Sequence, residues 1–446
     1  MMRRTIILLL LVAISLQWET SRLKKVMKSL PKSQIKQYIH KVNGPKVPEK
    51  GFYGHISVNQ NGDDLYFMLY PPRTPVANTP LIIWLSGGPG CASTMAMLFE
   101  NGPIQMDKNG QPQVNPYSWN DKAWLLFVDQ PLGTGFGHSS KRGIPDLEWQ
   151  LSDDFLVFLT KLYELYPQLD GLRLFITGES YAGHYVPAIS HRLYFYNNNQ
   201  FKVSGIAIGN GWTSPAVQQT AYVDFADKFD LVGGDKELLT KLKPLFDICQ
   251  KTYGLDPVFA KNMEGDLCGD LFSRLIVDPK SGKIRWNYYN YKESCAVDGC
   301  YDLTHELTWL ADPQVMSEIK ASRPYVDCSD DVNNIMSRID KRTDAGLYVG
   351  TLLDKGLPVL AYNGDLDVIC NYMSGDAWTS NVNWKSKADF QKASYEKALL
   401  PNGTAYGEVK KTENFQFLRF YGAGHLVPHD KPAESLYMIN KFAGLI

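Results

Sequence analysis

The sequence predicts an α/β fold, with a mostly parallel central sheet flanked by helices and interrupted by a cap insertion. Two observations lead to this class: short apolar runs that stop abruptly at Gly or Asp, and segments of helical spacing between them. The expected strands cover residues 54–58, 64–70, 81–85, 124–129, 172–177, 358–362 and 415–421, and the expected helices cover 150–166 and the stretch after Ser180 to about Tyr196.

The segment at 213–346 differs from the sequence on either side of it. It is more polar, has fewer strand-like runs and contains five of the seven cysteines. We therefore expect a core in two parts, 46–212 and 347–446, with the cap insertion between them. The Lys- and Arg-rich stretch at 19–45 is expected to be a surface lead-in or a short propeptide.

The N-terminus has the form of a signal peptide, expected at 1–18. Arg3 and Arg4 precede an apolar run at 6–16, which is too short to cross the ~30 Å hydrocarbon layer. No later stretch reaches the required ~18 apolar residues, so we expect no membrane association. Export into the secretory pathway, to a lysosome or vacuole or out of the cell, agrees with the seven cysteines. Asn402, in Asn-Gly-Thr, is an expected glycan acceptor.

Charge and histidine patterns exclude several functions. The chain has 46 basic and 47 acidic residues, so it lacks the broad positive field that nucleic-acid binding requires. None of the eight histidines belongs to a His-x-x-Glu or His-Glu-x-x-His pattern. We therefore expect neither a metal nor a cofactor.

A nucleophilic serine is predicted at residue 180. The string Gly178-Glu179-Ser180-Tyr181-Ala182 follows a strand pattern and opens a helical segment, which is the context of a nucleophile elbow. In an elbow, a tight turn presents the hydroxyl above the sheet, and small flanking residues let the turn close. The second small residue here is Ala rather than Gly, and such strings are also common in ordinary turns.

A serine hydroxyl needs a base to remove its proton, and the base needs an acid group to orient it. His425 follows the strand at 415–421, and both Asp365 and Asp367 follow the strand at 358–362. The order Ser, Asp, His along the chain is that of the α/β-hydrolase fold. The pattern alone leaves both aspartates open.

Four separated blocks resemble the serine carboxypeptidase family. They are Trp84-Leu85-Ser86-Gly87-Gly88-Pro89-Gly90-Cys91, Gly178-Glu179-Ser180-Tyr181-Ala182-Gly183, Asn363-Gly364-Asp365-Leu366-Asp367-Val368-Ile369-Cys370-Asn371 and Gly422-Ala423-Gly424-His425-Leu426-Val427-Pro428. Weaker likeness runs from about residue 50 to the C-terminus. The resemblance implies an α/β hydrolase that removes residues from peptides with a free C-terminus. It also implies the triad Ser180, Asp367 and His425, because the family's aspartate lies three residues before the Cys-Asn pair.

The resemblance further implies an oxyanion hole and a set of disulfides. The backbone N–H groups of Gly88 and Tyr181 would stabilise the tetrahedral intermediate. The implied disulfides are Cys91–Cys328, Cys249–Cys268 and Cys295–Cys300. Cys370 then stays free, and we expect it to be a small buried residue. Dimers are common in the family, so a homodimer is one expectation.

The same resemblance implies that glutamates bind the substrate's terminal carboxylate. Glu100 and Glu179 would act with Gly87 and Ser86, and at least one glutamate would keep its proton because carboxyl groups held together cannot all ionise. Peptidase activity should then be strongest at acid pH. The family usually has Asn at position 86, and a Ser hydroxyl gives one donor where an amide gives two, so carboxylate binding is expected to be altered.

Two other functions remain open on the sequence. Some plant relatives with the same triad transfer an acyl group to an alcohol instead of water. A protein of this fold can also act as a non-catalytic carrier or protective partner. The presence of Glu100 and Glu179 favours the peptidase over the first, and an intact Ser180, Asp367 and His425 argues against the second.

Overall fold

The computed structural model describes residues 40–42, 46–140, 143–196, 200–254, 265–295, 297 and 299–446. The predicted signal peptide at 1–18 lies outside these residues. Of the lead-in at 19–45, only β1 (His40–Val42) is described, as an edge strand that pairs antiparallel with β2 (Gly51–Ser57). The lead-in therefore contributes a short strand that the sequence did not predict.

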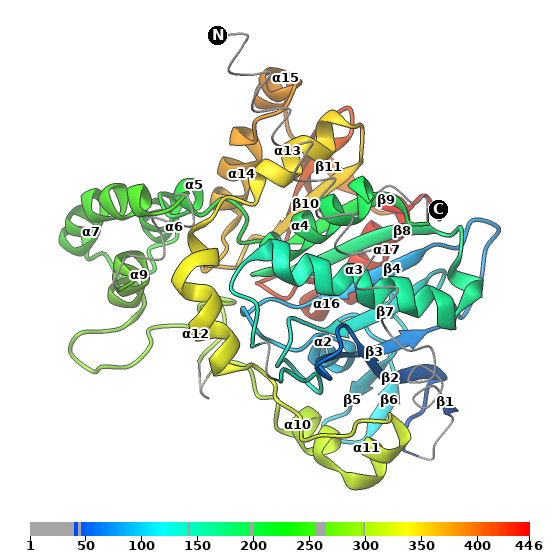
Figure 1. Cartoon of the computed structure of the whole chain (residues 1–446). Helices are drawn as coiled ribbons and strands as arrows, with labels where there is room; N and C mark the ends of the chain where they lie inside the picture. The colour runs from blue at the N-terminus through cyan, green and yellow to red at the C-terminus, as the bar shows by residue number, and fades with distance from the viewer. Residues whose placement is uncertain are drawn as a thin grey trace.

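Eleven strands form one sheet in the order β1-β2-β3-β7-β4-β8-β9-β10-β13-β12-β11 (Figure 1). The strands after β2 are β3 (Asp64–Tyr70), β4 (Leu81–Leu85), β7 (Trp124–Asp129), β8 (Arg173–Glu179), β9 (Lys202–Gly209), β10 (Val359–Gly364), β11 (Glu396–Leu399), β12 (Ala405–Thr412) and β13 (Phe415–Phe420). A separate small sheet pairs β5 (Ile104–Met106) with β6 (Pro112–Val114).

The centre of the large sheet is parallel. The six strands from β7 to β13 in the sheet order run in the same direction, and antiparallel strands extend the sheet on both sides. The whole sheet is therefore mixed, with the predicted parallel sheet as its core. Because parallel strands end at the same edge, the segments just past β8, β9, β10 and β13 lie at one edge of the sheet.

Successive side chains of a central strand enter two different cores. In β4, Leu81, Ile83 and Leu85 pack on one face, and Ile82 and Trp84 pack on the other, as the two-residue period of a strand requires. The first face is covered by α3 (Glu148–Leu165), α4 (Ala182–Phe195), α13 (Gly346–Asp354) and α14 (Tyr372–Asn381), and the second by α2 (Ser93–Phe99) and α17 (Pro432–Phe442).

Within the described residues, the chain between β9 and β10 is built from helices and loops. The helices are α5 (Pro215–Gln218), α6 (Ala221–Lys228), α7 (Lys236–Cys249), η3 (Gln250–Thr252), α9 (Leu267–Ile276), α10 (Thr304–Ala311), α11 (Pro313–Glu318), α12 (Asp330–Ile339) and η4 (Asp340–Arg342), followed by α13. Figure 1 shows α7 and α9 projecting to one side of the sheet, with α10 and α11 close to β5 and β6. These helices fall in the predicted cap insertion, and its boundaries stay a prediction.

Every strand that the sequence predicts is present, with ends that differ by a few residues. The central strand β9 was missed, because Lys202, Ser204 and Gly205 interrupt its apolar pattern and leave only a short apolar run at 206–208. It pairs with both β8 and β10. Hydrogen bonding to a strand on each side thus stabilises β9 although its own sequence pattern is only weakly strand-like.

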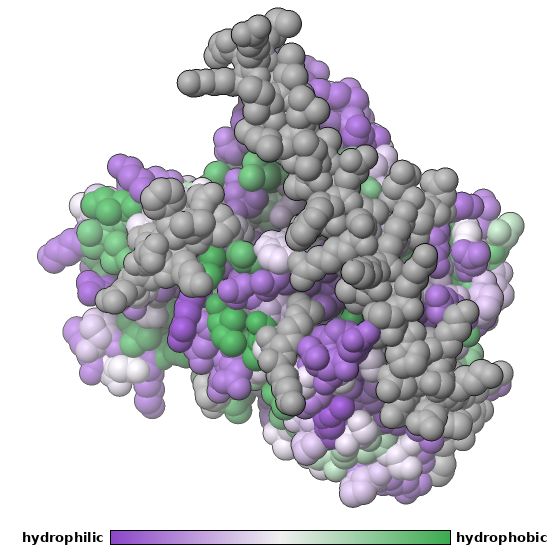
Figure 2. All heavy atoms as spheres, viewed as in Figure 1, coloured by the Kyte–Doolittle hydropathy of each residue, from purple (hydrophilic) through white to green (hydrophobic). Residues whose placement is uncertain are grey.

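Hydrophobic side chains reach the surface over the insertion. Figure 2 shows green patches among these helices, on a face that is otherwise mostly hydrophilic where it is coloured. Ile248 of α7 and Leu267 of α9 are exposed. Each helix in the described ranges is too short or too polar to cross a membrane.

Candidate active site

Ser180 occupies the tight turn between β8 and α4. Its φ of 63° lies in the left-handed region, and its N–H donates to the carbonyl of Gly209 on the neighbouring strand at 3.0 Å. The flanking glycines make this turn possible: a Cβ at Gly178 would lie 2.4 Å from the Leu85 carbonyl, and one at Gly183 would lie 2.7 Å from the Trp212 nitrogen. This is the strained geometry of a nucleophile elbow.

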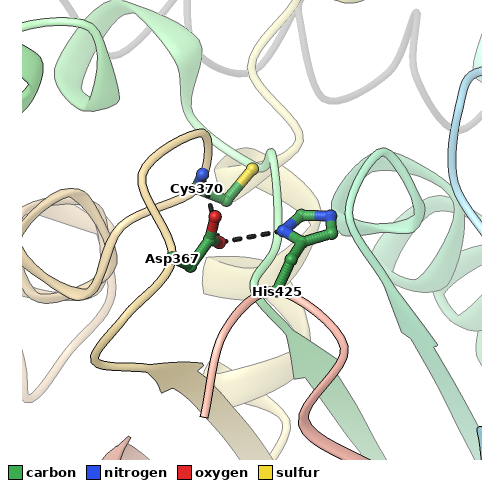
Figure 3. Close-up of side chains that lie close together, drawn as sticks. All are labelled: Asp367, Cys370 and His425. Atoms are coloured by element: carbon green, nitrogen blue, oxygen red, sulfur yellow. Dashed lines mark hydrogen bonds and ion pairs between the residues drawn. The ribbon is translucent and has the colours of Figure 1, made fainter. Parts of the chain in front are cut away.

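Asp367 and His425 meet at the same edge of the sheet. Asp367 follows β10 and His425 follows β13, and both side chains are buried. His425 Nδ1 and Asp367 Oδ2 are 2.8 Å apart, and the second ring nitrogen of His425 points away from the aspartate (Figure 3). Asp365 instead accepts from the Gly422 N–H, so the structure brings only the second aspartate to the histidine.

Asn210 joins this pair to the nucleophile's strand. Its Nδ2 donates to Asp367 Oδ2 at 2.7 Å, and its Oδ1 accepts from the Gly364 N–H at 3.2 Å. The residue before it, Gly209, holds the Ser180 N–H. Asn210 therefore fixes the ends of β8, β9 and β10 relative to one another, and the sequence analysis did not identify it.

The three side chains of the expected triad are not all hydrogen-bonded to one another. Among the described residues, the Asp367–His425 bond is present, whereas Ser180 Oγ has no hydrogen bond to His425. Such bonds are often long before a substrate binds and shorten in the enzyme–substrate complex.

The glycine loop after β4 lies directly against the elbow. A Cβ on Gly87 would lie 2.4 Å from the Tyr181 nitrogen and 2.7 Å from the Ser180 Cβ, so only Gly fits there. Gly88 has a φ of 110°, which also favours glycine. Over the described residues, the N–H groups of Gly88 and Tyr181 have no backbone acceptor, so both are available as donors.

Three carboxyl groups cluster next to the elbow that carries Ser180. Burial raises the pKa of Glu100 to about 8, and burial together with the nearby Glu100 raises the pKa of Glu179 well above its ordinary value. Burial also raises the pKa of Asp430, whose Oδ2 accepts from the Gly424 N–H at 2.6 Å. Two carboxyl groups held close together resist ionising at the same time, which is why Glu179 beside Glu100 has a raised pKa.

Asp430 was missed by the sequence analysis. It lies five residues after His425, at the end of α16 (Val427–Asp430), where its pattern is that of an ordinary helix-end residue. Asp430 approaches Glu100 and Glu179 only because the loops at this edge of the sheet pack together. The local sequence pattern around Asp430 does not predict this packing. The predicted Glu100 and Glu179 do lie together, although Glu100 viewed alone has the pattern of a surface residue.

Ser86 begins the glycine loop beside these groups. Its Oγ accepts from the Trp84 indole N–H at 3.4 Å, and its backbone nitrogen contacts Ser93 Oγ at 3.1 Å. Since the oxygen is occupied as an acceptor, its own hydroxyl proton is the group left to donate.

The structure contains three disulfides, and they are the pairs that the resemblance implied: Cys91–Cys328, Cys249–Cys268 and Cys295–Cys300. The first ties the glycine loop to the segment before α12. Cys370 is free and buried, as expected.

One group in the described chain has the donor set of a metal site. Potential ligand atoms of Asp367, Cys370 and His425 all lie within 4.8 Å of one another (Figure 3). The aspartate and the histidine are already bonded to each other, and burial raises the pKa of the Cys370 thiol well above its usual range. A thiol that keeps its proton is a poor ligand, so this group fits a proton-transfer pair better than a metal centre.

The parallel centre, the elbow and the acid–base pair past later strands define an α/β hydrolase with a serine nucleophile. Residues 41–444 match the profile of the serine carboxypeptidase family. Serine carboxypeptidase-like 49 of Arabidopsis thaliana is 33% identical over 408 residues, covering 90% of this chain and 78% of the relative. Carboxypeptidase Y of Candida albicans is 32% identical over 406 residues, covering 88% of this chain and 73% of the relative.

Among solved structures, a prohormone-processing carboxypeptidase of Saccharomyces cerevisiae, Kex1(delta)p, superposes with a TM-score of 0.77 at 23% identity, covering 93% of this chain and 97% of that chain. This likeness confirms the α/β-hydrolase fold. The chain belongs to the serine carboxypeptidase family, and the predicted family and enzyme class are confirmed. The roles of individual residues stay predictions.

Proposed function

We propose that Ser180, Asp367 and His425 remove the C-terminal residue of peptides through an acyl-enzyme. The observation that carries this proposal is the close approach of two glutamates at the elbow: Glu179, which is buried and directly precedes Ser180, and Glu100, which is partly buried with its Oε2 inaccessible to solvent. A nucleophile alone is common to many hydrolases, whereas carboxyl groups that can donate a hydrogen bond to a carboxylate suit a substrate with a free C-terminus.

The chemistry follows from the positions of the three side chains. Ser180 Oγ attacks the scissile carbonyl carbon and gives its proton to the second ring nitrogen of His425, while Asp367 holds the ring through Nδ1. The C–N bond breaks as His425 passes that proton to the leaving amine. Water then attacks the acyl carbon, His425 accepts the water proton, and the Ser180 oxygen leaves with that proton. The released products are the free amino acid and the shortened peptide.

The negative charge on the carbonyl oxygen requires donors, and the N–H groups of Gly88 and Tyr181 are suited to this role. Both are free of backbone acceptors, and Gly87 permits the close approach of the loop to the elbow. Fixed donors in a dry site stabilise the intermediate more than water does.

The terminal carboxylate of the peptide would be bound by Glu100 and Glu179, with Gly87 and Ser86 as additional donors. A protonated carboxyl donates to the substrate's carboxylate without leaving a buried cation when the site is empty. Rising pH removes that proton and turns a donor into a repelling charge, so peptide binding weakens.

The decisive experiment compares an N-blocked dipeptide with the same dipeptide amidated at its C-terminus. We expect release of the free C-terminal amino acid from the first, much slower cleavage of the second, and neither reaction with Ser180→Ala. Equal rates on the two dipeptides would contradict the proposed role of the carboxyl pair.

The acyltransferase alternative is tested in the same preparation. A glucose ester is supplied with an alcohol acceptor, and the products are analysed for transfer and for hydrolysis. Acyl transfer that exceeds dipeptide hydrolysis would favour the acyltransferase. A fluorophosphonate that labels Ser180 in the folded protein would exclude the carrier function.

We further propose that this activity belongs to the secretory pathway, either in a lysosome or vacuole or outside the cell. The chain combines the predicted signal at 1–18 with three disulfides, which persist in oxidising compartments. Asn402 is exposed in the turn between β11 and β12, where a glycan can attach. The homodimer stays a prediction.

A further inference from the structure

A second buried carboxyl pair lies behind the residue that follows the nucleophile. Glu148 begins α3 and Asp340 begins η4, and the two residues are 3% and 1% exposed. Asp340 Oδ1 accepts from the Glu148 N–H at 3.0 Å, and Oδ2 accepts from the Tyr181 hydroxyl at 2.7 Å. The proposed reaction gives neither carboxyl group a chemical step.

The two residues of the pair are joined by a hydrogen bond from the Glu148 backbone N–H to the Asp340 carboxylate. Among the described residues, neither carboxyl oxygen of Glu148 has a donor, and burial with the nearby Asp340 raises the pKa of Glu148 well above its ordinary value. The phenols that face the pair belong to Tyr181 just before α4, to Tyr185 in α4 and to Tyr348 in α13. The Glu148 carboxyl therefore resists losing its proton, whereas the Asp340 oxygens accept from the Glu148 N–H and from the Tyr181 hydroxyl.

The segment that carries Asp340 contacts the glycine loop and the side chain of Tyr181, the two parts of the chain that carry the proposed oxyanion donors. At its start, Cys328 is bridged to Cys91 of the glycine loop, and the Ser329 N–H donates to the Gly90 carbonyl at 2.9 Å. The helix α12 follows, with a rise of ~1.5 Å per residue, and Asp340 is the next residue after it. One rigid segment thus contacts the loop of Gly88 at one end and Tyr181 at the other.

Tyr181 is fixed from several sides. Its ring stacks on His184 with centroids 4.9 Å apart and meets Tyr185 edge-on at 5.2 Å, while its hydroxyl ends on Asp340. Removal of the hydroxyl bond would take away the contact at the far end of the ring and leave the residue that carries the backbone N–H less firmly held.

We infer that Asp340 is a positioning residue for the oxyanion hole, because its bond to the Tyr181 hydroxyl fixes the direction of the Tyr181 N–H. This inference rests on the proposed function of that N–H. On this inference, the insertion that contains Asp340 contributes to the rate of the reaction by holding an oxyanion donor, in addition to any contribution to substrate selection. A displacement of well under 1 Å at a preorganised donor lowers the rate because the stabilisation of the oxyanion depends on fixed geometry.

The test uses Tyr181→Phe and Asp340→Asn with two readouts. The first is kcat and KM for an N-blocked dipeptide. The second is the ratio of affinities for a blocked amino-acid aldehyde and the corresponding alcohol. The Ser180 oxygen adds to the aldehyde carbon, its proton moves to His425, and the aldehyde oxygen becomes an anion in the hole. The alcohol cannot form this adduct.

We expect both variants to lose roughly tenfold in kcat with KM unchanged, and to lose a similar factor in the aldehyde-to-alcohol ratio. Tyr66→Phe is the matched control, because the buried Tyr66 hydroxyl also donates to the insertion, at 2.7 Å to the Ile319 carbonyl. That variant should be less stable to heat but should keep both readouts at the wild-type values.

Wild-type kcat and a wild-type affinity ratio in folded Tyr181→Phe would overturn the inference, and this variant decides the matter if Asp340→Asn fails to fold. The proposed function itself would fail on a different result. In that case the wild-type protein would neither cleave the dipeptide nor react with the fluorophosphonate at Ser180.

Discussion

The described part of the chain contains two Ser–His–Asp arrangements, and their comparison indicates what the proposed catalytic site has beyond three side chains. In the second arrangement, which we name the Ser322 group, Ser322 Oγ lies 3.2 Å from His55 Nε2, and His55 Nδ1 lies 2.9 Å from Asp64 Oδ1. By hydrogen bonds alone, this group is more complete than the Ser180 site. The environments of the two differ in charge and in the presentation of the serine.

The charge on the aspartate is the first difference. Asp64 is paired with both terminal nitrogens of Arg323, at 3.0 and 2.9 Å, so a cation already balances its charge. Asp367 receives only neutral donors, from Asn210 and from the Cys370 N–H, besides His425. In the proposed reaction, its charge is therefore available to stabilise the imidazolium that forms when His425 takes a proton.

The presentation of the serine is the second difference. Ser180 is in a strained turn beside two free backbone donors, whereas Ser322 is an exposed residue in the insertion after α11. Strained turns persist only where the surrounding structure holds them, as Gly87, Gly178 and Gly183 do here. We therefore assign a structural role to the Ser322 group, which ties the insertion to β2 and β3.

The largest expected effect separates the two serines. Ser180→Ala should lower kcat for a blocked dipeptide by about 10⁶-fold, because the nucleophile is lost. Ser322→Ala should leave kcat unchanged. Steady-state kinetics and fluorophosphonate labelling check this, and labelling of Ser322 in the Ser180→Ala protein would break the comparison.

The aspartates should differ nearly as much. Asp367→Asn keeps the shape but favours the wrong histidine tautomer, so kcat should fall by about 10⁴-fold while stability changes little. Asp64→Asn should leave kcat unchanged and lower the free energy of unfolding by about 1–3 kcal/mol, because the Arg323 guanidinium loses its charged partner. Kinetics and urea denaturation measure the two effects. A large loss of kcat in Asp64→Asn would contradict the structural role.

The Ser322 group also marks a limit of sequence reasoning. Its three residues lie in two strands and a distant loop, with no motif that connects them. The elbow and the residues past β10 and β13 were predictable because each follows a strong apolar strand. The choice of Asp367 over Asp365 needed the family resemblance, since a difference of two positions in one loop decides which carboxylate reaches His425.

Other features depend on packing between distant segments. Asn210 follows β9, which has a weak strand pattern, and its bonds form only once β9 is paired on both sides. The burial of Glu100 and Glu148 is likewise set by elements far away in the sequence, so their raised pKa values could not be predicted from local pattern. The parallel centre of the sheet was predictable, and its antiparallel edges β11 and β12 were not.

A smaller effect comes from pH, which should act on the Ser180 site through its carboxyl neighbours. Burial raises the pKa of Glu100 from 4.5 to about 8, so this carboxyl donates below that pH and is lost as a donor above it. KM for a blocked dipeptide should be flat in the acid range and rise roughly tenfold one pH unit above the pKa of Glu100. Glu100→Gln cannot ionise, so its KM should not show this rise.

An ester without a free carboxylate is the control substrate, because its KM should not change with the ionisation of Glu100 at any pH.

The raised pKa of Glu100 also has a consequence for stability. The contribution of protonated Glu100 is full below the unfolded pKa of 4.5 and is lost as pH rises towards about 8. Unfolding in urea at several pH values should show this loss in the wild type and less of it in Glu100→Gln.

The smallest expected effect concerns the glycine loop, which the Ser322 group lacks. Ser86 Oγ already accepts from Trp84 Nε1, so the hydroxyl offers one donor to a bound carboxylate, whereas an Asn amide at this position offers two. One added hydrogen bond has a net value of about 0.5–1.5 kcal/mol, so Ser86→Asn should lower KM for the dipeptide by roughly two- to tenfold. KM for the amidated dipeptide should not change, because it has no carboxylate to bind. An equal change in both would mean that residue 86 shapes the loop instead of binding the peptide's end.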